Sequence, residues 1–290
     1  MDAKSFWSRV FTFIATPLKD DGEAIDEARL FETIDYQIEN GVDGVCIFGS
    51  TGGNGSFSDE EMMRTTRAAA RHVAGRVALV AGTGARTTTS CITLSKNAMD
   101  AGCEGIMVLP VSYWPLTTDE VFAHYERISS AVALPICIYN NPWTTGVDMK
   151  PDFLARLSKL DNVTCIKEST GDLSRISSIR RLTQDGITLI AGWESTSLQA
   201  FLAGATGWAP VCTNFVPQLA MEFFHAAGYL VPLEMPLAET IELRFQRLRI
   251  DAMPELDIMQ EVRVLKIVVR FPPRILTRIQ RRVGEEQIEI

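Results

Sequence analysis

The chain of 290 residues is long enough for one large α/β barrel or for two domains of average size. It is 46% hydrophobic and 22% charged, which excludes a disordered, collagenous or coiled-coil protein. The net charge of −8 argues against a nucleic-acid or anionic-membrane surface, because such surfaces need a concentrated basic face. The sequence has no apolar run of about 18 residues, and its start lacks the apolar core of a signal peptide. We therefore expect a cytoplasmic protein.

Short apolar runs recur with a regular spacing. They begin near residues 10, 43, 76, 105, 135, 163, 188 and 206, and amphipathic stretches separate them. Helix signals include a capping box at 58–61 and Pro151 at the start of DFLARLSKL. Apolar strands that alternate with helices indicate a parallel sheet covered on both faces. Eight such units predict a (β/α)8 TIM barrel over residues 1–230. An open doubly wound sheet, the alternative, usually has fewer units and a Gly-rich phosphate loop after its first strand.

The regular spacing stops after about residue 230. Three segments, each opened or preceded by proline, have a helical pattern, and they predict a C-terminal helical extension over residues 231–290. Basic residues in RFQRLR and RILTRIQRR are consistent with an anionic partner. The acidic balance of the whole chain favours instead the solvated face of amphipathic helices.

The potential metal ligands are scattered. The six cysteines form no C-x-x-C pair, and four of them lie in apolar runs, which favours buried reduced thiols. His72, His124 and His225 show no i,i+4 pairing and no neighbouring acidic cluster. We therefore expect no protein metal site.

Lys167 is the most informative candidate, because barrel active sites lie at the carboxyl ends of the strands. It follows the apolar run VTCI, and strand alternation directs it opposite to Ile166, into the barrel. Burial disfavours a charged amine, so a neutral lysine becomes available to form a Schiff base with a substrate carbonyl. The alternative is an ion pair with Glu168 or Glu194 at the rim of the barrel.

Two further groups end neighbouring strands. Tyr139, one strand away, could relay protons during imine formation and carbon–carbon bond cleavage. Its alternative role is a packed aromatic with a satisfied hydroxyl. Ser50 and Thr51 lie in the Gly-rich turn GSTGG, whose hydroxyls and backbone N–H groups suit a carboxylate. A plain βα turn is the alternative, since GSTGG matches neither a P-loop nor a dinucleotide fingerprint.

Taken together, these motifs resemble the dihydrodipicolinate synthase / N-acetylneuraminate lyase family of class I aldolases. The resemblance covers roughly residues 8–230 and rests on TPLKDDG at 16–22, GSTGG at 49–53, AGTGARTT at 81–88, YNNP at 139–142, IKEST at 166–170 and AGWES at 191–195. It implies a barrel with a C-terminal helical extension and a homo-oligomer, either a tetramer or a dimer. It also implies a lyase that binds pyruvate or another 2-oxoacid as a lysine imine, without a metal or organic cofactor.

The resemblance also implies roles for individual residues. Lys167 matches the Schiff-base lysine of the family, and Tyr139 matches its proton-shuttling tyrosine. Ser50 and Thr51 match the pair that holds the pyruvate carboxylate, with the Thr51 hydroxyl linked to Tyr139. Ala209 falls where a backbone group contacts the bound ketoacid, and Gly192, at the end of the seventh strand, joins the same substrate-binding set.

Three departures from the family pattern concern the second substrate. Gly53 replaces a glutamate, and Thr144 stands where dihydrodipicolinate synthases carry an arginine that grips the carboxylate of the aldehyde substrate. Val111-Ser112, with Tyr113 displaced by one position, replaces a tyrosine pair of which one member reaches into the neighbouring subunit.

These departures predict a substrate other than that of dihydrodipicolinate synthase. The far end of this substrate would be neutral or polyhydroxylated, and Thr144, Thr145 and Ser112 would read it. The leading hypothesis is a lyase or aldolase for pyruvate or a 2-keto-3-deoxy acid. The alternatives are a sugar-acid dehydratase that uses the same imine and a non-catalytic ketoacid-binding protein.

Overall fold

Eight parallel strands form one sheet in the computed structural model, which describes residues 3–20 and 22–228. They are β1 (Phe11–Phe13), β2 (Gly44–Ile47), β3 (Ala78–Gly82), β4 (Gly105–Val108), β5 (Ile136–Asn140), β6 (Val163–Glu168), β7 (Thr188–Ala191) and β8 (Gly207–Trp208). Neighbours in the sheet follow chain order, and a parallel bridge between Val10 and Trp208 joins the last strand to the first. The predicted (β/α)8 barrel is confirmed, and the open doubly wound alternative is wrong.

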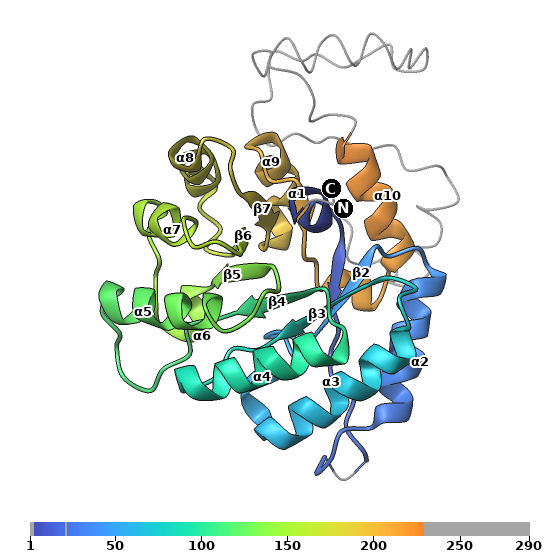
Figure 1. The fold of residues 1–290 in the computed structure, drawn as a ribbon. Coiled ribbons are helices and arrows are strands. Elements are labelled where there is room, and N and C mark those ends of the chain that lie inside the picture. The colour runs from blue at the N-terminus through green and yellow to red at the C-terminus, as the bar shows by residue number, and fades with distance from the viewer. Residues whose placement is uncertain (1–2, 21, 229–290) are drawn as a thin grey trace, which may run out of the picture. The chain divides into compact units, whose positions relative to one another are not determined.

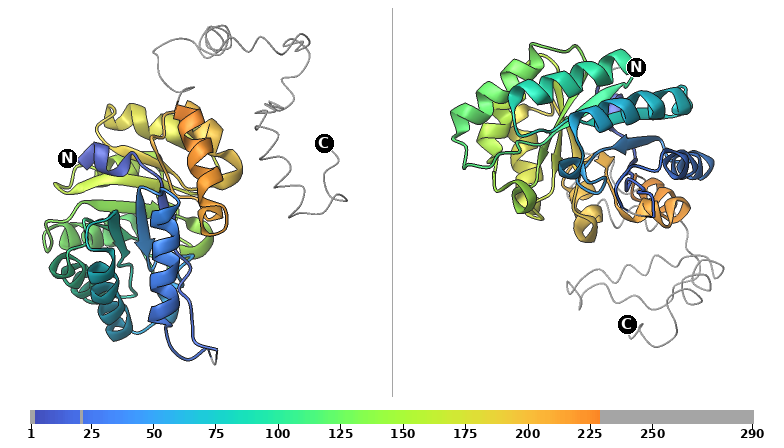
Figure 2. Two further views of the ribbon diagram at one scale, coloured as in Figure 1. Left: turned by 90° about the vertical axis from the view of Figure 1, so that its right-hand side faces the viewer. Right: turned by 90° about the horizontal axis from the view of Figure 1, so that it is seen from below.

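At least one helix follows each strand, and Figures 1 and 2 show these helices around the outside of the strands. The helices are α1 (Ala3–Trp7), α2 (Glu27–Glu39), α3 (Asp59–Val73), α4 (Thr88–Ala101), α5 (Thr118–Ser129), α6 (Pro142–Thr145), α7 (Pro151–Leu157), α8 (Leu173–Thr183), α9 (Ser197–Leu202) and α10 (Pro217–Gly228). Ser58 and Glu61 form the predicted capping box of α3, and Pro151 opens α7. The local signals in the sequence therefore mark the helix starts correctly.

The strand residues alternate between two hydrophobic clusters, because successive side chains of a strand point to opposite faces. The outer cluster lies between strands and helices and includes Ile138 and Ile166. The inner cluster fills the barrel and includes Phe13, Cys137 and Cys165. This alternation assigns each residue of β5 and β6 to one side of the barrel wall.

Helix α1 closes the amino end of the barrel. Phe6 and Trp7 belong to the inner cluster, and the indole N–H of Trp7 donates to the Thr164 hydroxyl at 3.0 Å. Gly105 at the start of β4 makes room for them, because a Cβ there would lie 2.9 Å from the Trp7 ring. With this end filled, the interior is left to open at the carboxyl ends of the strands.

The predicted C-terminal helical extension over 231–290 lies outside the described residues. Within residues 3–20 and 22–228, no helix has the length and apolar character needed to span a membrane. Over the same residues, no group of three or more His, Cys, Asp and Glu side chains is arranged to hold a metal ion. All six cysteines are free thiols, as their spacing predicts.

Candidate active site

Strands β5 and β6 place the two predicted catalytic side chains next to each other. Tyr139 and Lys167 are paired residues across this parallel pair of strands. Tyr139 lies two positions after Cys137, and Lys167 lies two positions after Cys165. Both cysteines belong to the inner cluster, so both side chains face the barrel interior. Lys167 therefore points away from the outer face that Ile166 occupies, as alternation predicts.

The Lys167 amine lies between two aromatic rings in this interior. Its side chain is only 4% exposed. Its Nζ is 3.6 Å from the ring centroid of Phe13 and 4.1 Å from that of Tyr139. Among the described residues, no carboxylate forms an ion pair with Lys167, so the alternative of a rim pair with Glu168 or Glu194 is not found. Glu194 instead accepts from a backbone N–H in the loop after β8.

Glu168 lies on the opposite side of β6 from Lys167. Its buried carboxylate accepts from the Asn140 side-chain amide at 2.9 Å and from the Thr170 backbone N–H at 2.8 Å. Burial raises the pKa of Glu168 above its usual value, although these two donors act in the opposite direction. Asn140 and Glu168 are themselves paired across β5 and β6. This bond outside the barrel therefore holds together the strand ends that carry Tyr139 and Lys167 inside it.

The Tyr139 hydroxyl has polar neighbours despite being buried. The Asn141 amide nitrogen donates to the phenolic oxygen at 3.0 Å, and Ser169 and Ser50 also interact with the hydroxyl. Burial, the largest influence, raises the pKa of Tyr139, but the charge of Lys167 and these three side chains outweigh it. The net pKa is lower than that of a free tyrosine. Such a phenol is better suited to exchange a proton near neutral pH.

The turn after β2 carries the predicted carboxylate-binding pair. Its backbone is fixed by Thr16, whose hydroxyl donates to the Gly52 carbonyl at 2.7 Å. Ser50 is exposed and interacts with Tyr139, whereas Thr51 is not among the hydrogen-bond partners of Tyr139. The expected link between the Thr51 hydroxyl and Tyr139 is therefore absent from this structure, and Ser50 provides the contact instead. A role for either residue in binding a carboxylate stays a prediction.

Gly192 and Ala209 lie at the ends of β7 and β8. The Gly192 N–H donates to the Glu168 carbonyl at 3.0 Å, and its own carbonyl accepts from the Ser169 hydroxyl at 3.0 Å. A Cβ at Gly192 would overlap the Ser169 oxygen and would lie 3.1 Å from the Cε of Lys167. Ala209 is buried in the inner cluster. A side chain at position 192 would therefore displace the Ser169 hydroxyl first and would also crowd the Lys167 stem.

We expect Gly192→Ala to slow imine formation by about 10- to 100-fold, because the new methyl group displaces the Ser169 hydroxyl and crowds the stem that carries the reacting amine. Overpacking should also cost on the order of 1–3 kcal/mol of stability. Trapping rates with borohydride and thermal unfolding measure the two effects. Gly55→Ala is the matched control, since a Cβ there meets nothing within 4 Å. An unchanged trapping rate for Gly192→Ala would contradict this account of the packing.

The three residues predicted to recognise the second substrate do not lie against the reactive groups. Thr144 and Thr145 belong to α6, and their hydroxyls donate to the Asn141 carbonyl at 3.2 and 3.0 Å. Ser112 lies in the loop after β4 and accepts from the Trp114 N–H at 3.2 Å. None of these three hydroxyls contacts Lys167 or Tyr139. Their role in specificity stays a prediction.

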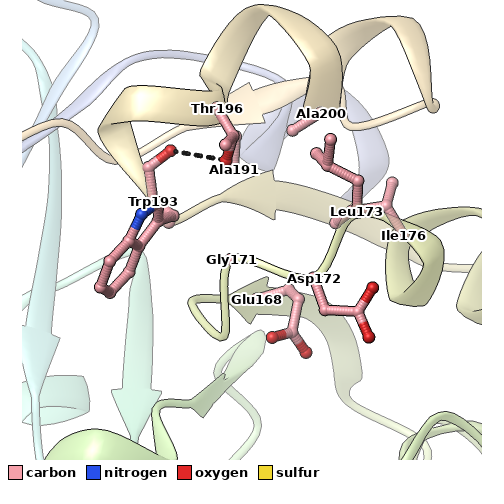
Figure 3. A pocket seen from close by; sticks show the side chains of 10 residues that line it. Glu168, Gly171, Asp172, Leu173, Ile176, Ala191, Trp193, Thr196 and Ala200 are labelled. Atoms are coloured by element: carbon pink, nitrogen blue, oxygen red, sulfur yellow. Dashed lines mark hydrogen bonds between the residues drawn. The ribbon is translucent and has the colours of Figure 1, made fainter.

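A pocket lies beside the site, between the connections that follow β6 and β7 (Figure 3). Its lining includes two carboxylates, Glu168 and Asp172, and the indole of Trp193. Ile176 and Ala191 of the outer cluster also line it, whereas Lys167 does not. This pocket is therefore on the outer side of β6, separate from the Lys167 amine.

Three residues that contact the reactive groups were not singled out from the sequence. Asn141 and Ser169 each follow a predicted catalytic residue by two positions, so alternation alone could have placed them on the same face. Phe13 comes from β1, far away in the chain. Only the closed barrel brings its ring to Lys167, and no local sequence signal identifies this contact.

Comparison with known proteins agrees with the fold and the motifs. A model of the "Dihydrodipicolinate synthetase family" matches residues 6–246. The chain belongs to this family. A 4-hydroxy-tetrahydrodipicolinate synthase from Saccharophagus degradans is 33% identical over 215 residues, which is 74% of either chain. The resemblance predicted from the sequence is thus confirmed, and membership makes the protein an enzyme of the class I aldolase or lyase type. The alternative of a non-catalytic binding protein is not supported.

Two solved structures extend the comparison. Dihydrodipicolinate synthase from Agrobacterium tumefaciens has a TM-score of 0.72 and 30% identity, covering 85% of this chain and 81% of that one. YagE from E. coli K12, a member of the same family in complex with pyruvate, has a TM-score of 0.73 and 27% identity. The match to YagE covers 86% of this chain and 83% of that chain.

Proposed function

We propose that this member of the family acts on pyruvate or a 2-keto-3-deoxy acid, which it binds as an imine on Lys167. The observation that carries the proposal is the Lys167 amine, buried without a carboxylate partner and paired across the sheet with Tyr139. A buried amine without an ion pair is free to act as a nucleophile. The pyruvate complex of the related YagE supports the same substrate class.

The proposed reaction starts when the Lys167 amine adds to the ketone carbon of the substrate. Loss of water from the resulting carbinolamine gives an imine, which accepts an electron pair from the adjacent carbon–carbon bond. Tyr139 gives its proton to the departing carbinolamine hydroxyl and, as the phenolate, then removes the proton of the C4 hydroxyl as the C3–C4 bond breaks. An aldehyde leaves, C3 of the remaining enamine takes up a proton, and water hydrolyses the imine to release pyruvate. The imine itself is the electron sink, so this chemistry needs no metal or organic cofactor.

Borohydride reduction in the presence of pyruvate tests the proposal directly. We expect a stable covalent adduct, which peptide mass spectrometry will locate on Lys167. Analysis of the products from a 2-keto-3-deoxy sugar acid then separates aldol cleavage, which gives pyruvate and an aldehyde, from dehydration, which keeps the carbon chain whole. If no lysine carries an adduct, the proposal is overturned.

We expect poor condensation of pyruvate with aspartate semialdehyde, because Thr144 offers no charge to the carboxylate of that aldehyde. An arginine would hold this group through two charge-assisted hydrogen bonds. Losing such a contact costs on the order of 2–5 kcal/mol, or roughly 30- to several-thousand-fold in kcat/KM. A comparison of kcat/KM for the semialdehyde with that for 2-keto-3-deoxy sugar acids measures this preference.

The variant Thr144→Arg provides the converse experiment. It should raise kcat/KM for the semialdehyde, whereas Thr145→Arg, one position further along α6, should not. Efficient use of the semialdehyde by the unaltered enzyme would show that another residue supplies the missing charge. A homo-oligomer, either a tetramer or a dimer, and a cytoplasmic location also belong to the proposal, and light scattering tests the oligomer.

A further inference from the structure

The Asn141 side chain forms a hydrogen bond with Tyr139 and does not cap its own helix. Asn141 follows β5 directly, and its Nδ2 donates to the Tyr139 hydroxyl oxygen at 3.0 Å. It also occupies the N-cap position of α6, where asparagine commonly caps the first turn. Its side chain makes no capping hydrogen bond there. The amide is thus available to the active site and does nothing for the helix end.

The other end of this amide is an unpaired buried acceptor. Asn141 is 9% exposed, and its Oδ1 has no hydrogen-bond partner among the described residues. An acceptor left in this way costs free energy, because it has lost water and gained nothing in exchange. Leucine has nearly the same shape and would avoid that cost. Packing alone therefore does not account for an amide at this position.

The bond from Asn141 constrains where the Tyr139 proton can point. A phenol has one proton to donate, and its oxygen also accepts. Because Asn141 donates to that oxygen, the Tyr139 O–H must point elsewhere. The Ser169 hydroxyl, which donates to the Gly192 carbonyl at 3.0 Å, and the Ser50 hydroxyl lie beside the same oxygen. The proton is left to point toward Ser169, toward Ser50 or to a molecule bound at Lys167.

We propose that Asn141 is a positioning residue for proton transfer, which holds the Tyr139 oxygen as an acceptor and directs its proton toward the substrate imine. The proposal rests on the proposed function, in which Tyr139 exchanges protons with the substrate. Asn141 does not touch the reacting atoms in this role and acts only through Tyr139.

The first test is Asn141→Leu, which removes the donor and keeps the shape. We expect kcat to fall about 10- to 100-fold, as for a misdirected catalytic group. The melting temperature should stay the same or rise, since the variant leaves no unpaired amide oxygen and Tyr139 retains Ser50 and Ser169. Borohydride should still trap pyruvate on Lys167 to the same final extent. A merely structural Asn141 would give the opposite pattern, with a lower melting temperature and little change in kcat.

The pH profile provides a second readout. Loss of the donor disfavours the phenolate and so raises the pKa of Tyr139. One limb of the pH profile of kcat/KM reports this pKa and should be missing in Tyr139→Phe. In Asn141→Leu the same limb should move to higher pH. Asn141→Asp keeps the shape but places a carboxylate, which cannot donate, against the phenolic oxygen. We expect it to reduce kcat more than Asn141→Leu and to move the same limb further in the same direction.

Asn162→Leu is the matched control. Asn162 precedes β6 at the amino end of the barrel, and its Nδ2 donates to the carbonyls of Val132 and Leu134 at 2.8 and 2.9 Å. Its replacement should lower the melting temperature and leave kcat and the pH limb unchanged. An unchanged kcat and pH limb in Asn141→Leu would overturn the inference. Failure of the unaltered enzyme to trap pyruvate would instead overturn the proposed function.

Discussion

Lys167→Ala is expected to abolish covalent trapping of pyruvate and to reduce turnover to the background rate. No other nucleophilic amine takes the place of Lys167 between the rings of Phe13 and Tyr139 in the described structure. The fold should persist, because the amine is a buried polar group without an ion-pair partner and the lost aliphatic stem weakens packing at one position of the barrel. Borohydride trapping followed by mass spectrometry measures the adduct, and circular dichroism checks the fold.

Two variants make the Lys167 experiment decisive. Lys167→Met keeps most of the aliphatic stem against the aromatic rings and removes only the amine, so it separates lost chemistry from lost packing. Lys159→Ala alters an exposed lysine of the same chain and should trap pyruvate at the rate of the unaltered enzyme. An adduct that persists in both Lys167 variants would show that another residue carries the imine.

The fold could be predicted because its signals are local and repeated. Apolar runs alternate with capped amphipathic helices, and the Ser58–Glu61 capping box and the Pro151 helix start both appear where the sequence places them. The same alternation, applied within one strand, gives the inward orientation of Lys167 opposite to Ile166. Periodicity thus determines both the class of fold and the side of the barrel wall on which a residue lies.

The contacts around the site could not be predicted in the same way. Glu168 and Glu194 are close to Lys167 in sequence or in strand order, which made a rim ion pair plausible. In the structure both carboxylates accept hydrogen bonds from other donors. Glu168 accepts from Asn140 and Thr170 on the far side of β6, and Glu194 accepts from a backbone N–H of the loop after β8. The choice between Ser50 and Thr51 as the neighbour of Tyr139 depends on the conformation of a Gly-rich turn. Such choices are made by loops and by the direction of single hydrogen bonds, which a residue pattern does not encode.

Tyr139→Phe should reduce turnover by about 10²–10⁴-fold, the usual contribution of a general acid–base group. The substitution removes one oxygen and keeps the ring against Lys167, so the final extent of imine trapping should change much less than the rate. A phenol that must be protonated to act supports turnover below its pKa, and the activity is lost as pH rises through that pKa. Because the pKa of Tyr139 is lower than that of a free tyrosine, this loss should occur below the ordinary tyrosine range. It should vanish from the pH profile of Tyr139→Phe.

Tyr36→Phe is the control for this prediction, since it removes the same oxygen from an exposed tyrosine on α2. It should leave both the rate and the pH profile unchanged. Comparison of the two variants therefore reports on the position of the hydroxyl rather than on the loss of a phenol as such. If Tyr139→Phe turned over as fast as Tyr36→Phe, the hydrogen bonds of Tyr139 would serve only packing. Proton transfer would then have to pass directly between the substrate and Ser50 or Ser169, the other hydroxyls next to Tyr139.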